Sequence, residues 1–346
     1  MPGHCSRGNS SRKYIGLSAL FHNPVDIQSE SFYNHMQMQS VCICIIDVRQ
    51  NNMKKHKLIR IIVSLAAVSC ILISSGCGNS SNPAEDEGKA GVPMIAVTIV
   101  PEQTFVEAVC GDLAEIIVMI PPGNSPENYE PSPAEMERFG RAVLYFTIGV
   151  PVEEANILPN SKDVRVVALQ EEVSAEYPDR LFETGERDPH IWLSPKRVKV
   201  MIASIAREMS SVDPANREYY ENNARAYIGE LDELDKEILS VLEPALNRKF
   251  IVFHPAFGYL AEDYGLTMYA LEHEGKESTP KHLQEMIDLA KAENIRAVFY
   301  QEEIDSSQSE AFAEEIGGKT IQLAPLAADF TENLRNMAAL IAEVMQ

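Results

Sequence analysis

The sequence predicts an α/β protein in which one long helix separates two α/β units. In each half of the chain, short apolar runs typical of buried strands alternate with helical patterns. A single amphipathic stretch, residues 214–245, lies between the halves. The chain has 346 residues, with 45% hydrophobic and 23% charged side chains, a composition typical of folded proteins and long enough for two cores.

The first unit is predicted to span residues 94–213. Its apolar runs are residues 93–100, 115–121, 142–149 and 164–169. Its helical patterns are residues 102–112, 133–142, 153–158 and 194–213. Such alternation predicts a mostly parallel sheet covered by helices. No glycine-rich phosphate loop follows any of these apolar runs, so the pattern gives little support to nucleotide binding.

Residues 214–245 are predicted to form a helix that joins the two units, because apolar residues recur at helical spacing from Tyr220 to Leu242. The second unit, residues 246–346, repeats the alternation. Its predicted strands are residues 249–255, 266–272, 297–303 and 319–325, and its helices are residues 257–265, 279–295, 309–318 and 331–345. Because open α/β sheets bind ligands beyond the carboxyl ends of their strands, we expect a binding cleft where the two units face each other.

Residues 53–76 have the pattern of a secretory signal peptide. The basic stretch MKKHKLIR begins at Met53, and the apolar run IIVSLAAVSCILI that follows is too short for a typical membrane-spanning helix. Small residues then lead into Cys77, which resembles the lipobox of bacterial lipoproteins and implies cleavage before Cys77 and lipidation of its thiol. Residues 77–93 would then be a flexible linker from the lipid anchor. The alternative is an ordinary cleaved signal that leaves a soluble protein.

Residues 1–52 precede this signal, whereas a signal peptide belongs at the start of a protein. We interpret them as a mis-annotated upstream segment, with translation starting at Met53. A true N-terminal extension is the alternative, and fold predictions exclude these residues.

The net charge and the cysteine count exclude some classes of partner and of metal site. The net charge is −21, and residues 1–76 hold 8 Lys or Arg against 3 Asp or Glu, so the chain from Cys77 onward carries −26. Such a surface repels nucleic acid and attracts cations. After cleavage only Cys77 and Cys110 remain, so with Cys77 lipidated we expect neither an internal disulfide nor a thiolate metal site.

Four histidines follow the cleavage point, and two of them are candidate metal ligands. His254 ends a predicted strand, which is where open sheets place ligand residues, and His190 follows the first unit. The two imidazoles would therefore approach the cleft from opposite units. Two neutral imidazoles with carboxylate oxygens suit Zn²⁺, and more oxygens suit Mn²⁺. The alternative for each is an ordinary buried or strand-end histidine that is hydrogen-bonded to its surroundings.

Three motifs occur in order: PPGNSPENYEPSP (121–133), DPHIWLSP (188–195) and FHPAFGYLAEDYG (253–265). Together with HEGKESTPKHL and PLAADFTENLRNMA further on, they resemble the metal-binding lipoproteins that deliver Zn²⁺ or Mn²⁺ to ABC importers. The resemblance runs from about residue 94 to the C-terminus. It implies two Rossmann-like α/β lobes joined by one long rigid α-helix, with one metal ion in the inter-lobe cleft bound by His190 and His254.

The chain departs from this family at two positions. Many members have histidine where this chain has Glu127, and we predict that the Glu127 carboxylate binds the metal instead. The family frequently has aspartate where this chain has Ala324, so a fourth ligand must come from elsewhere. Asp329 is the first candidate, and Glu303 and water are the others. The alternative for both acids is a solvated surface position.

Further residues are assigned supporting roles. Asp188 is predicted to accept a hydrogen bond from His190 and to orient its imidazole, as carboxylates often do beside metal ligands. Trp192, the only tryptophan, is predicted to pack against this loop and fix it. His273 and His282 flank a lysine-containing segment and are predicted to be surface groups.

The resemblance implies a non-enzymatic, extracytoplasmic, lipid-anchored monomer that captures Zn²⁺, or alternatively Mn²⁺, and hands it to the permease of an ABC importer. Binding should weaken below about pH 6.5, where imidazoles generally take up protons. A metal-dependent adhesin and a secreted metalloenzyme are the alternatives. Neither an HExxH run nor a nucleophile elbow supports the enzyme.

Overall fold

The structure, a computed structural model, describes residues 91–272, 278–303 and 307–345. All of them belong to one compact unit, Asp86–Gln346. The predicted signal peptide, Cys77, most of the predicted linker and His273 lie outside the described residues. Within the described ranges, every helix is too short or too polar to cross a membrane.

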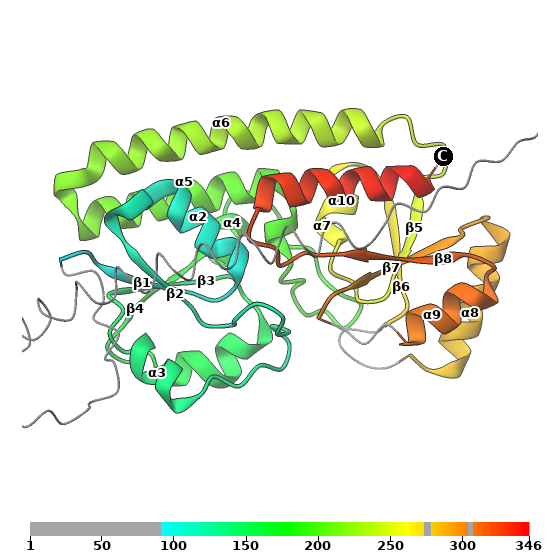
Figure 1. Cartoon of the computed structure of the whole chain (residues 1–346), viewed down its shortest axis with the longest axis horizontal. Coiled ribbons are helices and arrows are strands. Elements are labelled where there is room, and N and C mark those ends of the chain that lie inside the picture. Colours follow the sequence, from blue (N-terminus) through cyan, green and yellow to red (C-terminus); the bar gives the residue numbers. More distant parts are fainter. Residues whose placement is uncertain (1–90, 273–277, 304–306, 346) are drawn as a thin grey trace, which may run out of the picture. The chain divides into compact units, whose positions relative to one another are not determined.

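Two four-stranded parallel sheets form the framework of this unit, and they have the same strand order (Figure 1). In the first lobe the order is β2-β1-β3-β4, and in the second it is β6-β5-β7-β8. The strands of the first sheet are β1 (Met94–Val97), β2 (Glu115–Val118), β3 (Leu144–Thr147) and β4 (Arg165–Ala168). Those of the second are β5 (Lys249–Val252), β6 (Thr267–Ala270), β7 (Ala297–Gln301) and β8 (Lys319–Leu323). The predicted fold class, two parallel α/β lobes, is confirmed.

Helices follow the strands in both lobes, as the alternating pattern predicts. In the first lobe they are α2 (Val100–Cys110), α3 (Pro133–Phe139), a π-helical turn (Glu153–Ile157), α4 (Leu169–Ser174) and α5 (Pro195–Val212). In the second lobe they are α7 (Gly258–Asp263), α8 (Pro280–Ala292), α9 (Ser307–Glu315) and α10 (Phe330–Val344). The short helix α4 was not predicted, because its six residues are too few to show helical periodicity.

Helix α6 (Arg217–Leu242) runs along both lobes (Figure 1). At 1.5 Å per residue its 26 residues reach about 39 Å. The predicted start at Pro214 is a 3₁₀ turn, Pro214–Asn216, that leads into the α-helix. Tyr220, Leu231 and Ile238 lie on its buried stripe, and the stripe packs against α2, α5 and α10. One α-helix therefore contributes to the cores of both lobes.

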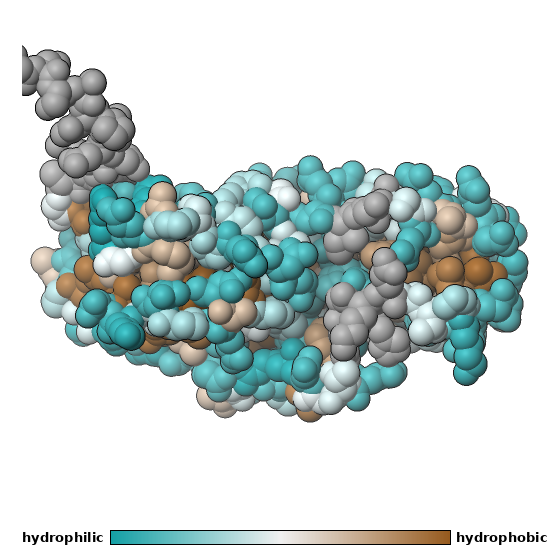
Figure 2. Space-filling view, turned by 90° about the horizontal axis from the view of Figure 1, so that it is seen from below, coloured by the Kyte–Doolittle hydropathy of each residue, from teal (hydrophilic) through white to brown (hydrophobic). Residues whose placement is uncertain are grey.

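The lobes pack directly on each other. Phe105 of α2 meets Phe330 of α10 edge to face, with ring centroids 4.9 Å apart. Thr104 Oγ1 donates to Ala328 O at 2.6 Å. Apolar residues of both lobes belong to one buried cluster. The contact between the lobes is therefore a packed apolar interface. Hydrophilic side chains cover most of the face in Figure 2, and hydrophobic residues show as separate patches between them.

Candidate metal centre

His190 lies in the segment that connects α4 to α5, and it is 3% exposed. Pro189 precedes it, a 3₁₀ turn (Ile191–Leu193) follows it, and Ser194 then caps α5 by accepting a hydrogen bond from Arg197 N. Asp188 Oδ1 accepts from both His190 N at 3.0 Å and His190 Nδ1 at 2.7 Å. Because a carboxylate only accepts, Nδ1 carries the hydrogen, and in the neutral imidazole Nε2 keeps a free lone pair. Asp188 therefore lies where the sequence predicted an orienting acid.

His254 follows β5 and is 5% exposed. It lies at the carboxyl end of the strand, as the pattern KFIVFHP predicts. Its Nδ1 is 2.7 Å from Glu272 Oε2, and Glu272 follows the neighbouring strand β6. This second carboxylate likewise fixes the tautomer and leaves Nε2 free. Glu272 was not predicted as a site residue, although it ends the predicted strand 266–272, which follows the strand of His254, and an acid at that position was a usable signal.

Glu127 comes from the loop between β2 and α3. Its backbone N–H donates to Ser125 Oγ at 3.3 Å, and Asn156 Nδ2 holds the loop by donating to Tyr129 O at 2.8 Å. The side chain of Glu127 is 29% exposed, much more than the two imidazoles. Glu127 therefore forms the solvent-facing side of the cluster.

These three residues form a group in which one ligand atom from each lies within 4.8 Å of the others. His190 Nε2 and His254 Nε2 are 3.3 Å apart, and Glu127 Oε1 is 3.8 Å from His254 Nε2. Two imidazole nitrogens bound at ~2.0–2.1 Å to a tetrahedral Zn²⁺ lie roughly 3.3 Å apart. Two facing lone pairs repel each other unless a cation or a proton lies between them. The arrangement therefore suits a small divalent cation.

The structure does not bring Asp329 into this group. Asp329 is exposed at the start of α10, and its charge acts on Tyr227 of α6, whose pKa is raised mainly by burial. Glu303 follows β7 and is half-buried, and burial raises its pKa. Its Oε2 has no hydrogen-bond partner among the described residues. Neither acid belongs to the three-residue group, so the choice of a fourth ligand stays a prediction.

Trp192 connects the His190 segment to the second lobe. Its ring lies 5.1 Å from the His190 ring, centroid to centroid, and its Nε1 donates to Pro325 O at 3.0 Å. The indole is 1% exposed. It therefore contacts His190 on one side and the loop after β8 on the other. His282, by contrast, lies on α8 and contacts Ala270 O at 3.1 Å, outside the three-residue group.

Two further buried acids lie at the carboxyl edge of the first sheet. Glu102 Oε2 accepts from the backbone N–H groups of Thr98 and Ile99, at 2.9 and 3.1 Å. Glu153 accepts from the N–H groups of Ile148 and Gly149, both at 2.8 Å, and from the Thr98 hydroxyl. Burial raises the pKa of Glu153 to about 7 and, together with the charge of Glu153, raises the pKa of Glu102 well above its usual range. Both acids bind backbone N–H groups, and neither belongs to a group of potential metal ligands among the residues that the structure describes.

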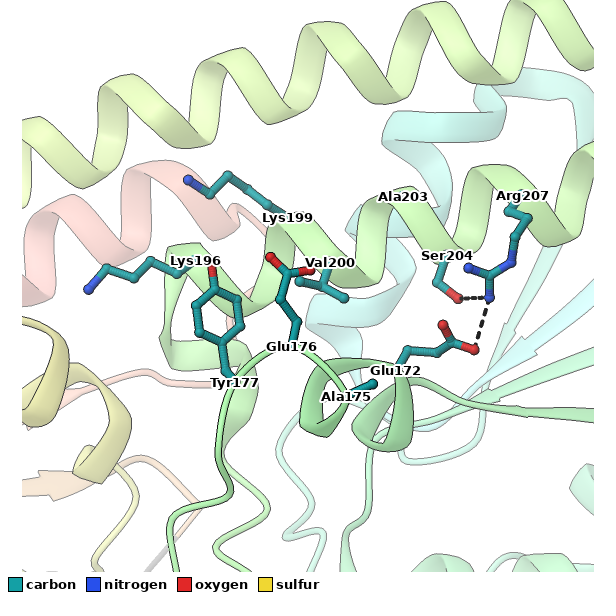
Figure 3. A pocket seen from close by; sticks show the side chains of 10 residues that line it. All are labelled: Glu172, Ala175, Glu176, Tyr177, Lys196, Lys199, Val200, Ala203, Ser204 and Arg207. Carbon is teal, nitrogen blue, oxygen red and sulfur yellow. Dashed lines mark hydrogen bonds and ion pairs between the residues drawn. The ribbon is translucent and has the colours of Figure 1, made fainter.

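A surface groove between α4 and α5 is shown in Figure 3. Its cations are neutralised by acids: Arg207 pairs with Glu172 at 2.9 Å and Lys199 with Asp232 at 2.6 Å. Such paired charges are typical of a solvated surface and make the groove a weaker ligand site than the histidine cluster.

Two α/β lobes that together hold a pair of oriented imidazoles and a carboxylate define a metal-binding solute-binding protein of the two-lobed type. The family described as zinc-uptake complex component A, periplasmic, matches residues 95–344, and the chain belongs to this family. Its members are metal-binding proteins of ABC importers that lie outside the cytoplasm.

One relative is the high-affinity zinc uptake system protein ZnuA of Bacillus subtilis (strain 168). It is 29% identical over 268 residues, covering 73% of this chain and 84% of that protein. Among solved structures, the crystal structure of a ZnuA is 36% identical, with a TM-score of 0.70, and covers 74% of this chain and 100% of that one. The solute-binding protein FpvC from Pseudomonas aeruginosa, in complex with Mn²⁺, is 28% identical, with a TM-score of 0.65 and coverages of 74% and 98%.

Proposed function

We propose that this chain captures Zn²⁺ outside the cytoplasm and delivers it to the permease of an ABC importer. The observation that carries the proposal is the pair of Nε2 atoms, 3.3 Å apart, each turned toward the other by a carboxylate on Nδ1. Glu127 would be the third ligand. Asp329, Glu303 or water would be the fourth, since neither acid belongs to the three-residue group of ligand atoms.

The donor set favours Zn²⁺ over Mn²⁺. Two nitrogens and one carboxylate match the tetrahedral N/O sites of zinc, whereas Mn²⁺ prefers more oxygen ligands. The ZnuA of Bacillus subtilis is named for zinc uptake, and the FpvC structure contains Mn²⁺, so relatives support either metal. Mn²⁺ is therefore the alternative cargo, with Glu303 or waters supplying the additional oxygens.

Buried, oriented ligands suit capture rather than catalysis. The two imidazoles are almost fully buried and the lobes share a core, so the histidine side of a bound metal would be shielded from bulk water. Release to a permease would require the lobes to shift enough to separate His190 from His254. Protons compete with the metal for both imidazoles, so binding should weaken on acidification.

Metal titration of the purified protein tests the cargo. Residues 78–346 would be stripped of metal and titrated with Zn²⁺ and Mn²⁺, beside His190→Ala, His254→Ala and Glu127→Ala. We expect one Zn²⁺ per chain and losses of more than about 100-fold for the histidine variants, beyond the effect of an outer partner. His282→Ala and Glu130→Ala are matched controls that should bind like the wild type, because His282 lies outside the three-residue group and Glu130 is an exposed acid on the same loop as Glu127. Absence of a tight metal in the wild type would overturn the proposal, and tighter Mn²⁺ would replace zinc with manganese.

We further propose a monomer anchored through a lipid on Cys77. Intact mass analysis and membrane fractionation of the full chain, beside Cys77→Ser, test the anchor. Lipid should be found on Cys77 and the variant should leave the membrane fraction. Unmodified Cys77, or a variant that stays in the membrane, would contradict the anchor. Light scattering of the soluble protein tests the monomer.

A further inference from the structure

Arg180 supports the acid that orients His190. Its Nη1 donates to Asp188 Oδ2 at 2.8 Å, while the other oxygen of Asp188 accepts from His190. The side chain of Asp188 is 0% exposed, so its carboxylate has little water to solvate it. Arg180 supplies the balancing charge and fixes the carboxylate plane. The direction of the His190 ring therefore depends on Arg180 through Asp188.

Arg180 also lies against the segment that carries His254. A Cβ at Gly258, the first residue of α7, would be 2.4 Å from Arg180 Nη1 and 2.5 Å from Cζ. The guanidinium of Arg180 therefore packs directly against the backbone of Gly258, four residues beyond His254. The next residue, Tyr259, accepts from Arg180 N at 3.0 Å and donates to Asp188 O at 3.1 Å. Arg180 thus contacts the segments of both histidines.

We propose that Arg180 is a positioning residue that sets the separation and direction of His190 and His254, an inference that rests on the proposed function. A planar guanidinium can lie flat on a glycine while it pairs with a carboxylate, which an ammonium cannot do. When Arg180 is lost, the Asp188 carboxylate loses its partner and the space over Gly258 opens. Both imidazoles then sample more orientations, and metal affinity falls although no ligand has changed.

A matched pair of variants tests this role. Arg180→Met should weaken Zn²⁺ binding by about 10–100-fold, the range typical for partners of metal ligands. Arg187→Met is the control, because its side chain is equally exposed, 29%, and lies on the same loop. It pairs with Asp179 and Glu171 and not with Asp188, so its affinity should stay within about twofold of the wild type. Arg180→Lys keeps the charge without the flat contact and should fall between the two.

Gly258→Ala tests the same contact from the opposite side. Gly258 begins a helix and has no positive φ, so alanine fits its backbone, and the three atoms closest to the new methyl all belong to Arg180. The methyl should displace the guanidinium and weaken Zn²⁺ binding in the wild type. In the Arg180→Met background it should have little further effect, which a double-mutant cycle measures.

A readout without metal separates this inference from the proposed function. In the metal-free protein, nitrogen NMR should show one His190 tautomer with hydrogen on Nδ1. Arg180→Met should broaden or shift that signal and Arg187→Met should not. Equal losses for the two arginine variants, or an unchanged His190 signal with unchanged affinity in Arg180→Met, would overturn the role of Arg180. If the wild type binds no metal, the proposed function fails, while the NMR comparison still decides whether Arg180 positions His190.

Discussion

Glu102 and Glu153, two buried acids of the first lobe, contact backbone, whereas two acids of the second lobe contact a candidate metal ligand or the other lobe. In the first lobe, Glu102 and Glu153 accept hydrogen bonds from N–H groups that follow β1 and β3. In the second lobe, Glu272 binds the imidazole of His254. Asp263, at the end of α7, binds Ser194 and Arg197 at the start of α5. The two sheets have the same strand order, so topology alone does not produce this difference.

This difference indicates that the acids of the first lobe serve folding stability and that Glu272 of the second lobe serves the candidate metal centre. In the first lobe, Glu102 and Glu153 accept hydrogen bonds from backbone N–H groups after the strands, and the pKa values of both acids are raised. In the second lobe, Glu272 follows β6 and binds the imidazole of His254, a candidate metal ligand. We therefore expect changes to Glu102 or Glu153 to alter folding stability with little effect on metal binding. Changes to Glu272 should do the reverse, since function depends on side chains placed on a fold.

The largest expected effect is the loss of the contact between the lobes at Asp263. Asp263→Asn would leave Arg197, which is 3% exposed, without its charged partner at 3.1 Å. Breaking one side of a buried ion pair lowers the free energy of unfolding by about 3–5 kcal/mol. Urea denaturation measures this change. Asp232→Asn is the control, because Asp232 of α6 is 49% exposed and pairs with Lys199, which lies on α5 like Arg197, and it should lose about 1 kcal/mol or less. Equal losses for the two variants would show that the ion pair of Asp263 with Arg197 contributes little to holding the lobes together.

The second prediction concerns pH and the acids of the first lobe. Because folding raises the pKa values of Glu102 and Glu153, the folded state binds more protons than the unfolded state above about pH 4.5. The free energy of unfolding should therefore fall as pH rises from about 4.5 to 7, by up to about 1.4 kcal/mol per pH unit for each group.

Glu102→Gln isolates one of these two contributions. The amide oxygen can accept from Thr98 and Ile99, and its NH₂ takes the place of Oε1, which has no partner among the described residues. The variant should gain stability relative to the wild type as pH rises, while its Zn²⁺ affinity stays unchanged. Denaturation at several pH values measures the gain. A constant difference across this range would mean that Glu102 is not protonated in the folded protein.

The third prediction concerns the corresponding acid of the second lobe. Glu272→Gln keeps an oxygen for His254 Nδ1 but removes the negative charge, so Zn²⁺ affinity should fall by about 10-fold, with Glu272→Ala nearer 100-fold. Stability should change by less than about 1 kcal/mol, because the side chain is partly exposed. Glu293→Gln, which alters an exposed pair with Lys249, is the control for both measurements. If Glu272→Gln lowered the free energy of unfolding but left Zn²⁺ affinity unchanged, Glu272 would serve stability like Glu102 and Glu153, and the two lobes would not differ in this respect.

Much of this arrangement could be predicted from sequence. Apolar runs of fixed spacing predict both sheets, and the motifs around Glu127, His190 and His254 predict three side chains that the structure brings together. Asp188 could be predicted because it lies two residues from His190, within reach of an Asx-type hydrogen bond. These predictions depend on local order or on the general rule for strand ends.

Contacts between distant segments could not be predicted in this way. Glu272 and His254 are 18 residues apart and meet only because β5 pairs with β6. Arg180 reaches Gly258 across the lobes, and nothing in the local pattern of either residue indicates that contact. Asp329 was selected for its position near Ala324 in the chain; it is exposed at the start of α10 and lies outside the three-residue group, so its role as a ligand stays a prediction. Side-chain direction at a loop depends on tertiary packing, which residue spacing does not encode.

The smallest expected effect concerns the exposed ion pair between α6 and α10. Arg335 Nε is 2.8 Å from Glu237 Oε2, and the two side chains are 41% and 51% exposed. Water and salt screen such a pair, so Arg335→Ala should lower the free energy of unfolding by about 0.2–1 kcal/mol, and by less at high salt. Urea denaturation at low salt and at about 1 M salt measures both values. Asp263→Asn should retain most of its loss at high salt, because its partner Arg197 is buried. If Arg335→Ala were as damaging as Asp263→Asn, surface charge would hold the second lobe to the long helix, and the distinction between buried and exposed acids would not hold.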